Sequence, residues 1–296
     1  MFRVDEIAEN SFKFLELKNT KDGSMARISL SEGGRLQNLK FNAISLIEDQ
    51  ANFDYKDSYA SAILFPFVSR IENGAYTFND KKYKFNCNQS DGKNALHGLV
   101  YNKEFKILEK KYSSNSCAVK IYYSEKNESQ GFPFKYSMYL TYTLLKNELQ
   151  LQVLVKNDDN KAFPFVLGWH PYFISDDLDS SYLNFKSDKK IMYDENLITK
   201  EIVSKKTVGK FHIESKQLDD CFVLEDNAVQ FSTSKYHVQL SSNSKENFLQ
   251  LYTPKNRSAI AIEPMTGISN SFNNKIGLQV LAPNASHNLK WTLKLL

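Results

Sequence analysis

Alternation of apolar and polar residues with a period of two recurs along this chain and constrains its fold more than any other feature. The clearest examples are the segments 136–144, 149–155 and 289–295. Successive side chains of a β-strand point to opposite faces of the sheet, so this period predicts half-buried strands. The 16 tyrosines and 21 phenylalanines agree with that prediction, because aromatic residues are enriched in strands. We therefore expect a protein built mostly of β-structure.

The segments between these strands are short and carry turn-forming residues. Lys146 and Asn147 join the first two segments, and Asn79 and Asp80 predict a tight hairpin between YTF and KKYKF. Asn and Asp suit such turns because they tolerate a left-handed backbone. Helical periodicity is scarce, and we expect a short helix only in the segment 57–65.

Many strands, short turns and few helices together predict an all-β fold, a large antiparallel β-sandwich with a few short helices. No internal repeat, low-complexity segment or linker rich in proline or glycine divides the chain. We therefore expect residues 1–296 to form a single domain. We also expect a monomer, because the sequence has no long apolar helix or heptad pattern through which two chains would pair.

Charge and composition argue against several classes of protein. The chain has 38 Lys and Arg against 34 Asp and Glu, without long blocks of one sign, so we expect no nucleic-acid partner. No window of about 18 apolar residues is present and the N-terminus lacks a signal-peptide pattern, which predicts a cytoplasmic protein without membrane contact. Gly-rich nucleotide-binding motifs are absent, so we expect no cofactor. Three widely spaced cysteines, Cys87, Cys117 and Cys221, favour reduced thiols.

Five histidines are present, and two of them lie in contexts that favour a function. No pair shows HxH or HExxH spacing, so we expect no metal site built from local ligands. His212, His237 and His287 occur in polar alternating segments and are expected at the surface. His97 lies in NALHGLV after a polar loop, and His170 lies in LGWHPYF at the end of an apolar run. Each is either a histidine bonded to nearby backbone or a functional group on a rigid scaffold.

Glu263 is the most informative acidic residue. In AIAIEP, strand alternation places it on the same face as Ala259 and Ala261, whose small side chains leave space above them. Because Pro264 cannot donate a hydrogen bond to a ladder, we expect Glu263 at a strand end or edge, where ligand pockets tend to open. A solvated glutamate at a strand end is the alternative.

Arg70 and two aspartates complete the set of charged candidates. Arg70 follows the apolar stretch FPFVS and precedes ENG. Its guanidinium is a planar fork of donors that suits vicinal oxygens, and a surface arginine beside a turn is the alternative. Asp219 and Asp220 are adjacent in LDDCF. Adjacent residues of a strand face opposite sides, so at most one of the two readily enters a given pocket.

The order of these segments resembles the aldose 1-epimerase (galactose mutarotase) family over nearly the whole chain. The shared segments are FPFVSRIENGAYTF, NALHGLVYNKEF, GFPFKYSMYLTYTL, FVLGWHPYF, LDDCF, AIAIEP and LQVLAPNAS. The resemblance implies a β-sandwich of antiparallel strands with a sugar site in an open cleft. It also implies a small monosaccharide as partner, and interconversion of the α and β anomers of an aldose.

The resemblance further implies a role for each candidate residue. His170 matches the family's general acid, Glu263 its general base, and His97 a second histidine that hydrogen-bonds the sugar. Arg70 and Asp219 match positions that contact ring hydroxyls. An acid and a base of this kind would flank the sugar. A histidine, with an unperturbed pKa of about 6.5, can supply a proton near neutral pH, and a glutamate, with an unperturbed pKa of about 4.3, is ionised and can accept one.

Trp169, before His170, is one of several variants seen in the family, and two other positions depart from the residues common there. Ser69 stands where Asn is common and Asp220 where His is frequent, and we expect both departures to bear on substrate contacts. Aromatic residues such as Trp169 or Tyr172 are expected to form an apolar wall of the site.

Three other functions remain open at this point. A carbohydrate-binding or sensing protein of the same fold would need no acid and base. A hexose-6-phosphate 1-epimerase should have an extra basic cluster for the phosphate. A glycoside hydrolase would need two carboxylates about the scissile bond, and Asp219 with Glu263 would be the pair.

Overall fold

The computed structural model describes residues 1–49 and 54–296, and antiparallel β-strands dominate them. The expected all-β fold is confirmed. The alternating segments at 136–144 and 149–155 form neighbouring strands joined by a tight turn, and the segment 289–295 pairs with the second of them. Residues 75–84 form the hairpin expected from Asn79 and Asp80.

The largest sheet has nine strands. In spatial order they are β11 (Lys106–Tyr112), β12 (Ser116–Lys126), β13 (Lys135–Leu145), β14 (Glu148–Asn157), β28 (Ser286–Leu295), β24 (His237–Ser242), β23 (Ala228–Ser232), β18 (Tyr182–Asn184) and β21 (Lys210–His212). In β13 the side chains of the apolar set beginning at Tyr136 are buried, as their alternation requires.

Two further sheets cover this one. The five-stranded sheet contains β1 (Phe2–Glu9), β2 (Phe12–Asn19), β3 (Ser24–Ser29), β4 (Leu36–Phe41) and β5 (Ile44–Ile47). The eight-stranded sheet contains β20 (Thr199–Thr207), β19 (Ser187–Tyr193), β22 (Asp219–Leu224), β25 (Phe248–Tyr252), β26 (Ala259–Met265), β16 (Gly168–Trp169) and β6 (Ile63–Leu64), with β17 (Tyr172–Ile174) also paired to β26.

Short elements complete the fold. Three pairs of strands are β7 (Arg70–Ile71) with β10 (Ala95–Leu96), β8 (Ala75–Phe78) with β9 (Lys81–Lys84), and β15 (Phe163–Phe165) with β27 (Gln279–Leu281). The helices are α1 (Tyr55–Ser58) and α2 (Ser271–Asn274), with a 3-10 turn at Glu72–Gly74. Among the described residues, no helix has the length and apolar character needed to cross a bilayer.

The helix predicted at 57–65 is mostly wrong. Helix α1 covers only the first two of those residues and ends at Tyr59, whose φ of 52° is left-handed. Residues Ile63–Leu64 instead form β6, which pairs with β16. Ile63 and Leu64 pair within the eight-stranded sheet, so tertiary pairing overrides the local helical appearance of this part of the segment.

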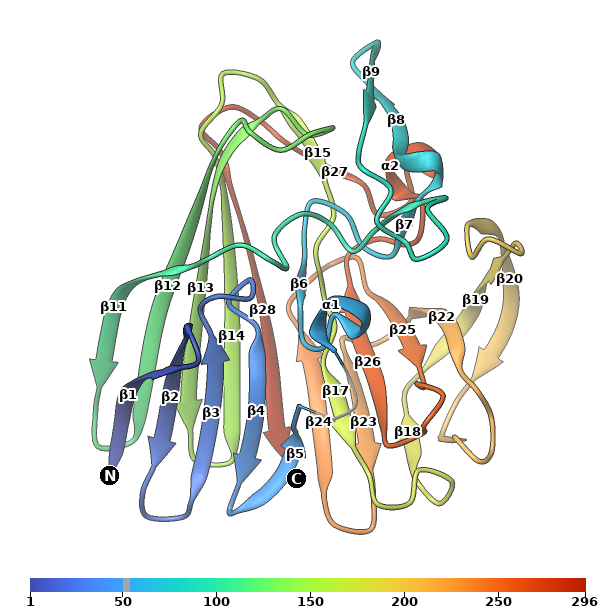
Figure 1. Ribbon diagram of the computed structural model, residues 1–296. Coiled ribbons are helices and arrows are strands. Elements are labelled where there is room, and N and C mark those ends of the chain that lie inside the picture. The colour runs from blue at the N-terminus through green and yellow to red at the C-terminus, as the bar shows by residue number, and fades with distance from the viewer. Residues whose placement is uncertain (50–53) are drawn as a thin grey trace.

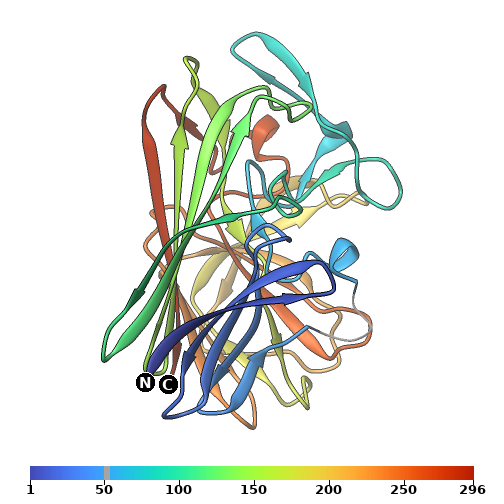
Figure 2. The same ribbon diagram turned by 60° about the vertical axis from the view of Figure 1, so that its left-hand side comes forward.

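The nine-stranded sheet forms one layer, and the other two sheets pack side by side against it (Figure 1, Figure 2). Under the eight-stranded sheet, the rings of Trp169 and Trp291 stack with centroids 6.0 Å apart. Under the five-stranded sheet, Tyr142 donates a hydrogen bond to the carbonyl of Gly34 at 2.8 Å. A single apolar core therefore joins all three sheets.

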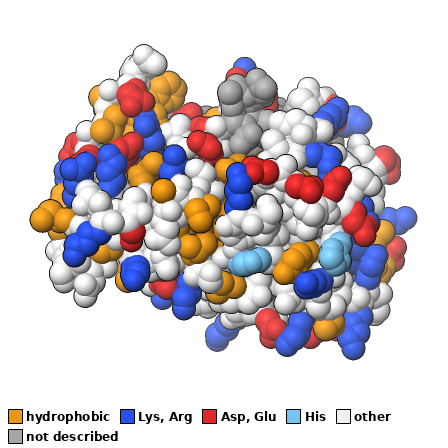
Figure 3. All heavy atoms as spheres, turned by 90° about the horizontal axis from the view of Figure 1, so that it is seen from below, with side chains coloured by type: hydrophobic (Ala, Val, Ile, Leu, Met, Phe, Trp, Pro, Cys, Tyr) orange, Lys and Arg blue, Asp and Glu red, His pale blue; other side chains and the backbone are white. Residues whose placement is uncertain are grey.

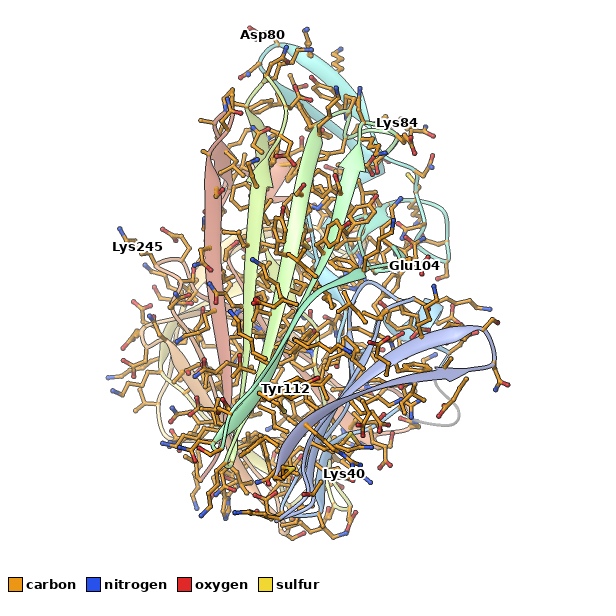
Figure 4. The ribbon with its side chains drawn as sticks, turned by 90° about the vertical axis from the view of Figure 1, so that its left-hand side faces the viewer. Lys40, Asp80, Lys84, Glu104, Tyr112 and Lys245 are labelled. Carbon is orange, nitrogen blue, oxygen red and sulfur yellow. The ribbon has the colours of Figure 1, made fainter. Side chains whose placement is uncertain are left out.

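The exterior agrees with the nearly balanced charge. Figure 3 shows Lys and Arg side chains interspersed with Asp and Glu over the face seen from below. At the outer edge of the sandwich, β11 lies beside β1 (Figure 4). Lys110 of β11 pairs there with Glu6 of β1.

Candidate functional site

A cavity of about 160 Å³ opens over β22, β25 and β26 of the eight-stranded sheet. A cavity needs about 10–15 Å³ of volume for each water that it encloses. This cavity therefore has room for roughly ten waters, a volume that suits one small polar molecule. All five predicted site residues line it: Arg70, His97, His170, Asp219 and Glu263. They come from five separate strands or loops, which the fold brings together.

Glu263 lies in the interior of the sheet, not at the predicted strand end or edge. Strand β26 continues to Met265 and has β25 on one side and β16 and β17 on the other. On the latter side, the amide of Ile262 bonds to the carbonyl of Pro171, and that of Thr266 to Leu167. Alternation directs the nitrogen of Pro264 to the same side, between these bonds. The proline is tolerated because the partner strand is interrupted between β16 and β17.

This interruption brings His170 beside Glu263. His170 lies between β16 and β17, its amide bonds to the carbonyl of Ala62 at 3.1 Å, and its carbonyl accepts from the amide of Ser61 at 2.7 Å. Nε2 of His170 is 3.4 Å from Oε1 of Glu263. The two side chains are only 5% and 3% exposed.

Aromatic rings hold the imidazole of His170 in place. The ring of Tyr172 stacks on it with centroids 5.1 Å apart and planes 3° from parallel. On another side, His97 meets it edge to face at 4.9 Å. Of the two aromatic residues expected to wall the site, Tyr172 lines the cavity. Trp169 does not, because it points into the core against Trp291.

His97 is fixed through its backbone. Its φ is 59°, in the left-handed region, and its amide bonds to the carbonyl of Ser69 at 2.9 Å. The ring packs between His170 and Tyr59, both at 4.9 Å between centroids. Burial lowers the pKa of His97 well below its usual value, and the nearby His170 and Arg70 lower it further.

Arg70 reaches the cavity from β7. Its Nε donates a hydrogen bond to the side-chain carbonyl of Gln89 at 3.2 Å. The side-chain amide of Asn94 donates to the same oxygen at 3.3 Å. Gln89 and Asn94 lie in the polar loop that precedes His97. Ser69, one of the two departures from the family pattern, also lines the cavity.

Asp219 enters the cavity from β22, and Asp220 does not. Oδ1 of Asp219 accepts a hydrogen bond from the side-chain amide of Gln250 at 2.6 Å. Burial raises the pKa of Asp219, while the charge of Arg70 opposes that shift. Asp220 projects from the opposite face and pairs with Lys190 at 2.5 Å, so the expectation that Asp220 bears on substrate contacts is wrong.

Burial shifts the pKa values of both His170 and Glu263 away from their ordinary values. Burial lowers the pKa of His170 to about 3, because the charged imidazolium would lose its hydration. Burial also raises the pKa of Glu263 well above its usual value, with Asp219 adding to the shift and Arg70 opposing it. Both shifts favour the uncharged forms, a neutral imidazole and a protonated carboxyl group.

The sequence interpretation missed some residues of the site. Gln250 and Tyr252 both line the cavity. A signal for Gln250 exists in FLQLY, where one amide interrupts a strand whose other positions are apolar on both faces.

His287, outside the site, is not the surface residue we predicted. It is half-buried against the ring of Phe165, with centroids 5.1 Å apart.

The arrangement can transfer protons between two neighbouring atoms of a bound molecule. Glu263 and His170 present an oxygen and a nitrogen to the cavity, 3.4 Å apart, and each can carry a proton. Arg70 supplies donors and Asp219 supplies acceptors, a combination that suits a ligand rich in hydroxyl groups.

Comparison with known proteins identifies relatives over nearly the full length. The family model of aldose 1-epimerase matches residues 13–294. The uncharacterized protein YihR of Escherichia coli K12 is 23% identical over 269 residues, which cover 87% of this chain and 86% of that protein. A galactose mutarotase-like protein of Clostridium acetobutylicum superposes with a TM-score of 0.90 at 20% identity, covering 100% of this chain and 98% of its own. Galactose 1-epimerase from Lactobacillus acidophilus NCFM gives a TM-score of 0.81 at 16% identity, covering 100% and 99%. The two structural likenesses confirm the predicted fold.

Proposed function

Because this chain belongs to the aldose 1-epimerase family, we propose that it interconverts the α and β anomers of a free aldose by opening and closing the sugar ring. The observation that supports this most strongly is the pair of buried side chains, Glu263 and His170, 3.4 Å apart at the wall of a cavity of monosaccharide scale. The reaction needs an acid and a base and no group beyond them.

The chemistry explains why the two groups are neighbours instead of lying on opposite sides of the sugar. Ring opening removes the proton of the hydroxyl on C1 and adds a proton to the ring oxygen, and both oxygens are bonded to C1. For this step the proton of Glu263 first passes to the neighbouring Nε2 of His170, 3.4 Å away. Glu263, now the carboxylate, accepts the proton from the C1 hydroxyl, and His170, now the imidazolium, donates one to the ring oxygen. Rotation about the bond between C1 and C2 then exposes the other face of the aldehyde, and closure runs the two transfers in reverse. Positioned proton transfer of this kind contributes about 10²–10⁴-fold to a rate.

The remaining residues hold the sugar during these transfers. Arg70 donates to vicinal hydroxyls, Asp219 accepts from them, and His97 contributes a neutral ring, since burial lowers its pKa. Fixing the ring in this way converts binding energy into orientation of the reacting atoms. Arg70 also opposes the rise in the pKa of Glu263, which favours the carboxylate form that accepts a proton.

Polarimetry tests the proposal and separates it from the alternatives. We expect purified protein to accelerate the approach of freshly dissolved α-glucose or α-galactose to anomeric equilibrium. We expect hexose 6-phosphates to react more slowly than the free sugars, because the lining contains three carboxyl groups, Asp57, Asp219 and Glu263, and a single Lys or Arg side chain, Arg70. A preference for the phosphorylated sugar would support the other branch. Sugar binding without acceleration would support the sensing function, and release of an alcohol from a glycoside would support the hydrolase.

The protonation of His170 gives a second test. Because burial lowers its pKa to about 3, we expect its imidazole to stay neutral as the pH falls from about 8 to about 5, a range in which free imidazole takes up a proton. Side-chain ¹⁵N NMR of the ligand-free protein, assigned with a His170→Gln variant, measures this directly. A titration of the His170 nitrogens near pH 6.5 would show that the empty site holds a charged histidine.

A further inference from the structure

A chain of hydrogen bonds beneath the cavity ends on Asp219. The hydroxyl of Tyr193, at the end of β19, donates to Oε1 of Gln250 at 2.8 Å. The amide nitrogen of Gln250 then donates to Oδ1 of Asp219 at 2.6 Å. Tyr193 is not among the residues that line the cavity, whereas Gln250 and Asp219 are. Three adjacent strands, β19, β22 and β25, supply one member each.

Tyr193 determines which way the amide of Gln250 points. An amide side chain has a donor end and an acceptor end of nearly the same shape. With its oxygen held by the Tyr193 hydroxyl, the nitrogen faces Asp219. If the amide turned over, its oxygen would face the Asp219 carboxylate, and two acceptors would meet in a buried site.

The protonation states of the surrounding groups maintain this orientation of the Gln250 side-chain amide. Burial raises the pKa of Tyr193 well above its usual range, so its hydroxyl keeps the proton that it donates to Gln250. The thiol of Cys221 lies near the same hydroxyl, and burial raises its pKa to about 12, so the thiol adds no charge there.

We propose that Tyr193 is a positioning residue, which acts through Gln250 to keep Asp219 ionised and oriented toward the hydroxyl groups of the sugar. The proposal rests on the function proposed above for its kinetic consequence, but the hydrogen-bond chain can be tested without activity. Asp219 needs this support because burial and the neighbouring carboxylate of Asp220 both favour its neutral form. The charged and titratable groups near Asp219 on its own face are Arg70, Tyr172, Tyr193, Cys221, Tyr252 and Glu263, and Asp220 acts on it from the opposite face of the sheet. Among these, Arg70 favours the ionised form.

A Tyr193→Phe variant tests the proposal kinetically. We expect KM for the preferred aldose to rise about tenfold, the effect of losing one well-placed hydrogen bond, with kcat within about twofold of the wild type. The rise should be larger at mildly acidic pH, because Asp219 then takes up a proton as the pH falls through its raised pKa. Tyr142→Phe is the matched control, since it removes a buried hydroxyl that donates to Gly34, outside the cavity. We expect KM of this control to match the wild type.

Two further measurements make the outcome decisive. In ligand-free protein, ¹³C NMR of aspartate carboxyl groups, assigned with Asp219→Asn, should show a higher pKa of Asp219 in Tyr193→Phe than in wild type. If Tyr193 acts through Gln250, then adding Tyr193→Phe to a Gln250→Leu variant should change neither KM nor this pKa. An unchanged Asp219 pKa in Tyr193→Phe overturns the proposal, as does a rise in KM no larger than that of Tyr142→Phe. If wild-type protein accelerates no anomeric exchange, the proposed function fails and the NMR measurement alone decides the role of Tyr193.

Discussion

Replacing Glu263 with glutamine should lower kcat for mutarotation by about 10³-fold, the midpoint of what a positioned general base contributes. Glutamine keeps the shape of the side chain and still fills its place on β26, but it cannot accept a proton from the C1 hydroxyl. KM should change little, because Arg70, His97 and Asp219 would still hold the sugar. Single-wavelength polarimetry over a range of sugar concentrations separates kcat from KM.

A matched control distinguishes loss of the base from loss of a buried glutamate. Glu125 is also 3% exposed, and it accepts hydrogen bonds from the hydroxyls of Tyr123 and Ser129 away from the cavity. Glu125→Gln should alter stability and leave kcat close to the wild type. If Glu263→Gln kept a rate within about tenfold of the wild type, Glu263 would not be the base, and the proton transfers would have to use another carboxyl such as Asp219.

Much of the fold could be predicted because its signal is local. The alternation in 136–144 fixes which side chains of β13 face the core, and the structure buries the predicted set. The arrangement of one long sheet against two shorter ones has no such signal. It depends on pairings between distant segments, such as β14 with β28, which no single stretch of sequence encodes.

The candidate site, like the fold, could be predicted only in part from the sequence. Residue types and motif order were enough to nominate Glu263 and His170, but their proximity depends on an interruption between β16 and β17. We took Pro264 as a sign of a strand edge, whereas the interruption allows a proline inside the sheet. The sequence also could not predict the pKa shifts of Glu263 and His170, because these shifts come from burial, which depends on the tertiary structure.

The loop that carries His97 depends on a glycine that no other residue can replace without strain. Gly98 has a φ of +78°, and a Cβ built on it would lie 2.3 Å from the carbonyl oxygen of Phe65 and 2.8 Å from its nitrogen. These are backbone atoms of a segment that bridges to Gly98 and accepts a hydrogen bond from the amide of Leu99 at 2.7 Å. Neither backbone segment can move aside without breaking this hydrogen bond, so an added Cβ would force the loop and the segment of β6 apart.

We therefore expect Gly98→Ala to lower the free energy of unfolding by about 3 kcal/mol or more, in the range of severe single substitutions. Gly92→Ala is the matched control, because Gly92 has a similar φ of +71° in the preceding loop but no atom within 4 Å of its added Cβ. It should lose only about 1 kcal/mol, the cost of a left-handed backbone for a residue with a side chain. The shift in the midpoint of urea unfolding, at an unchanged slope, measures both. Equal shifts for the two variants would mean that the approach of Gly98 to Phe65 contributes nothing to stability, and that the position of His97 does not depend on it.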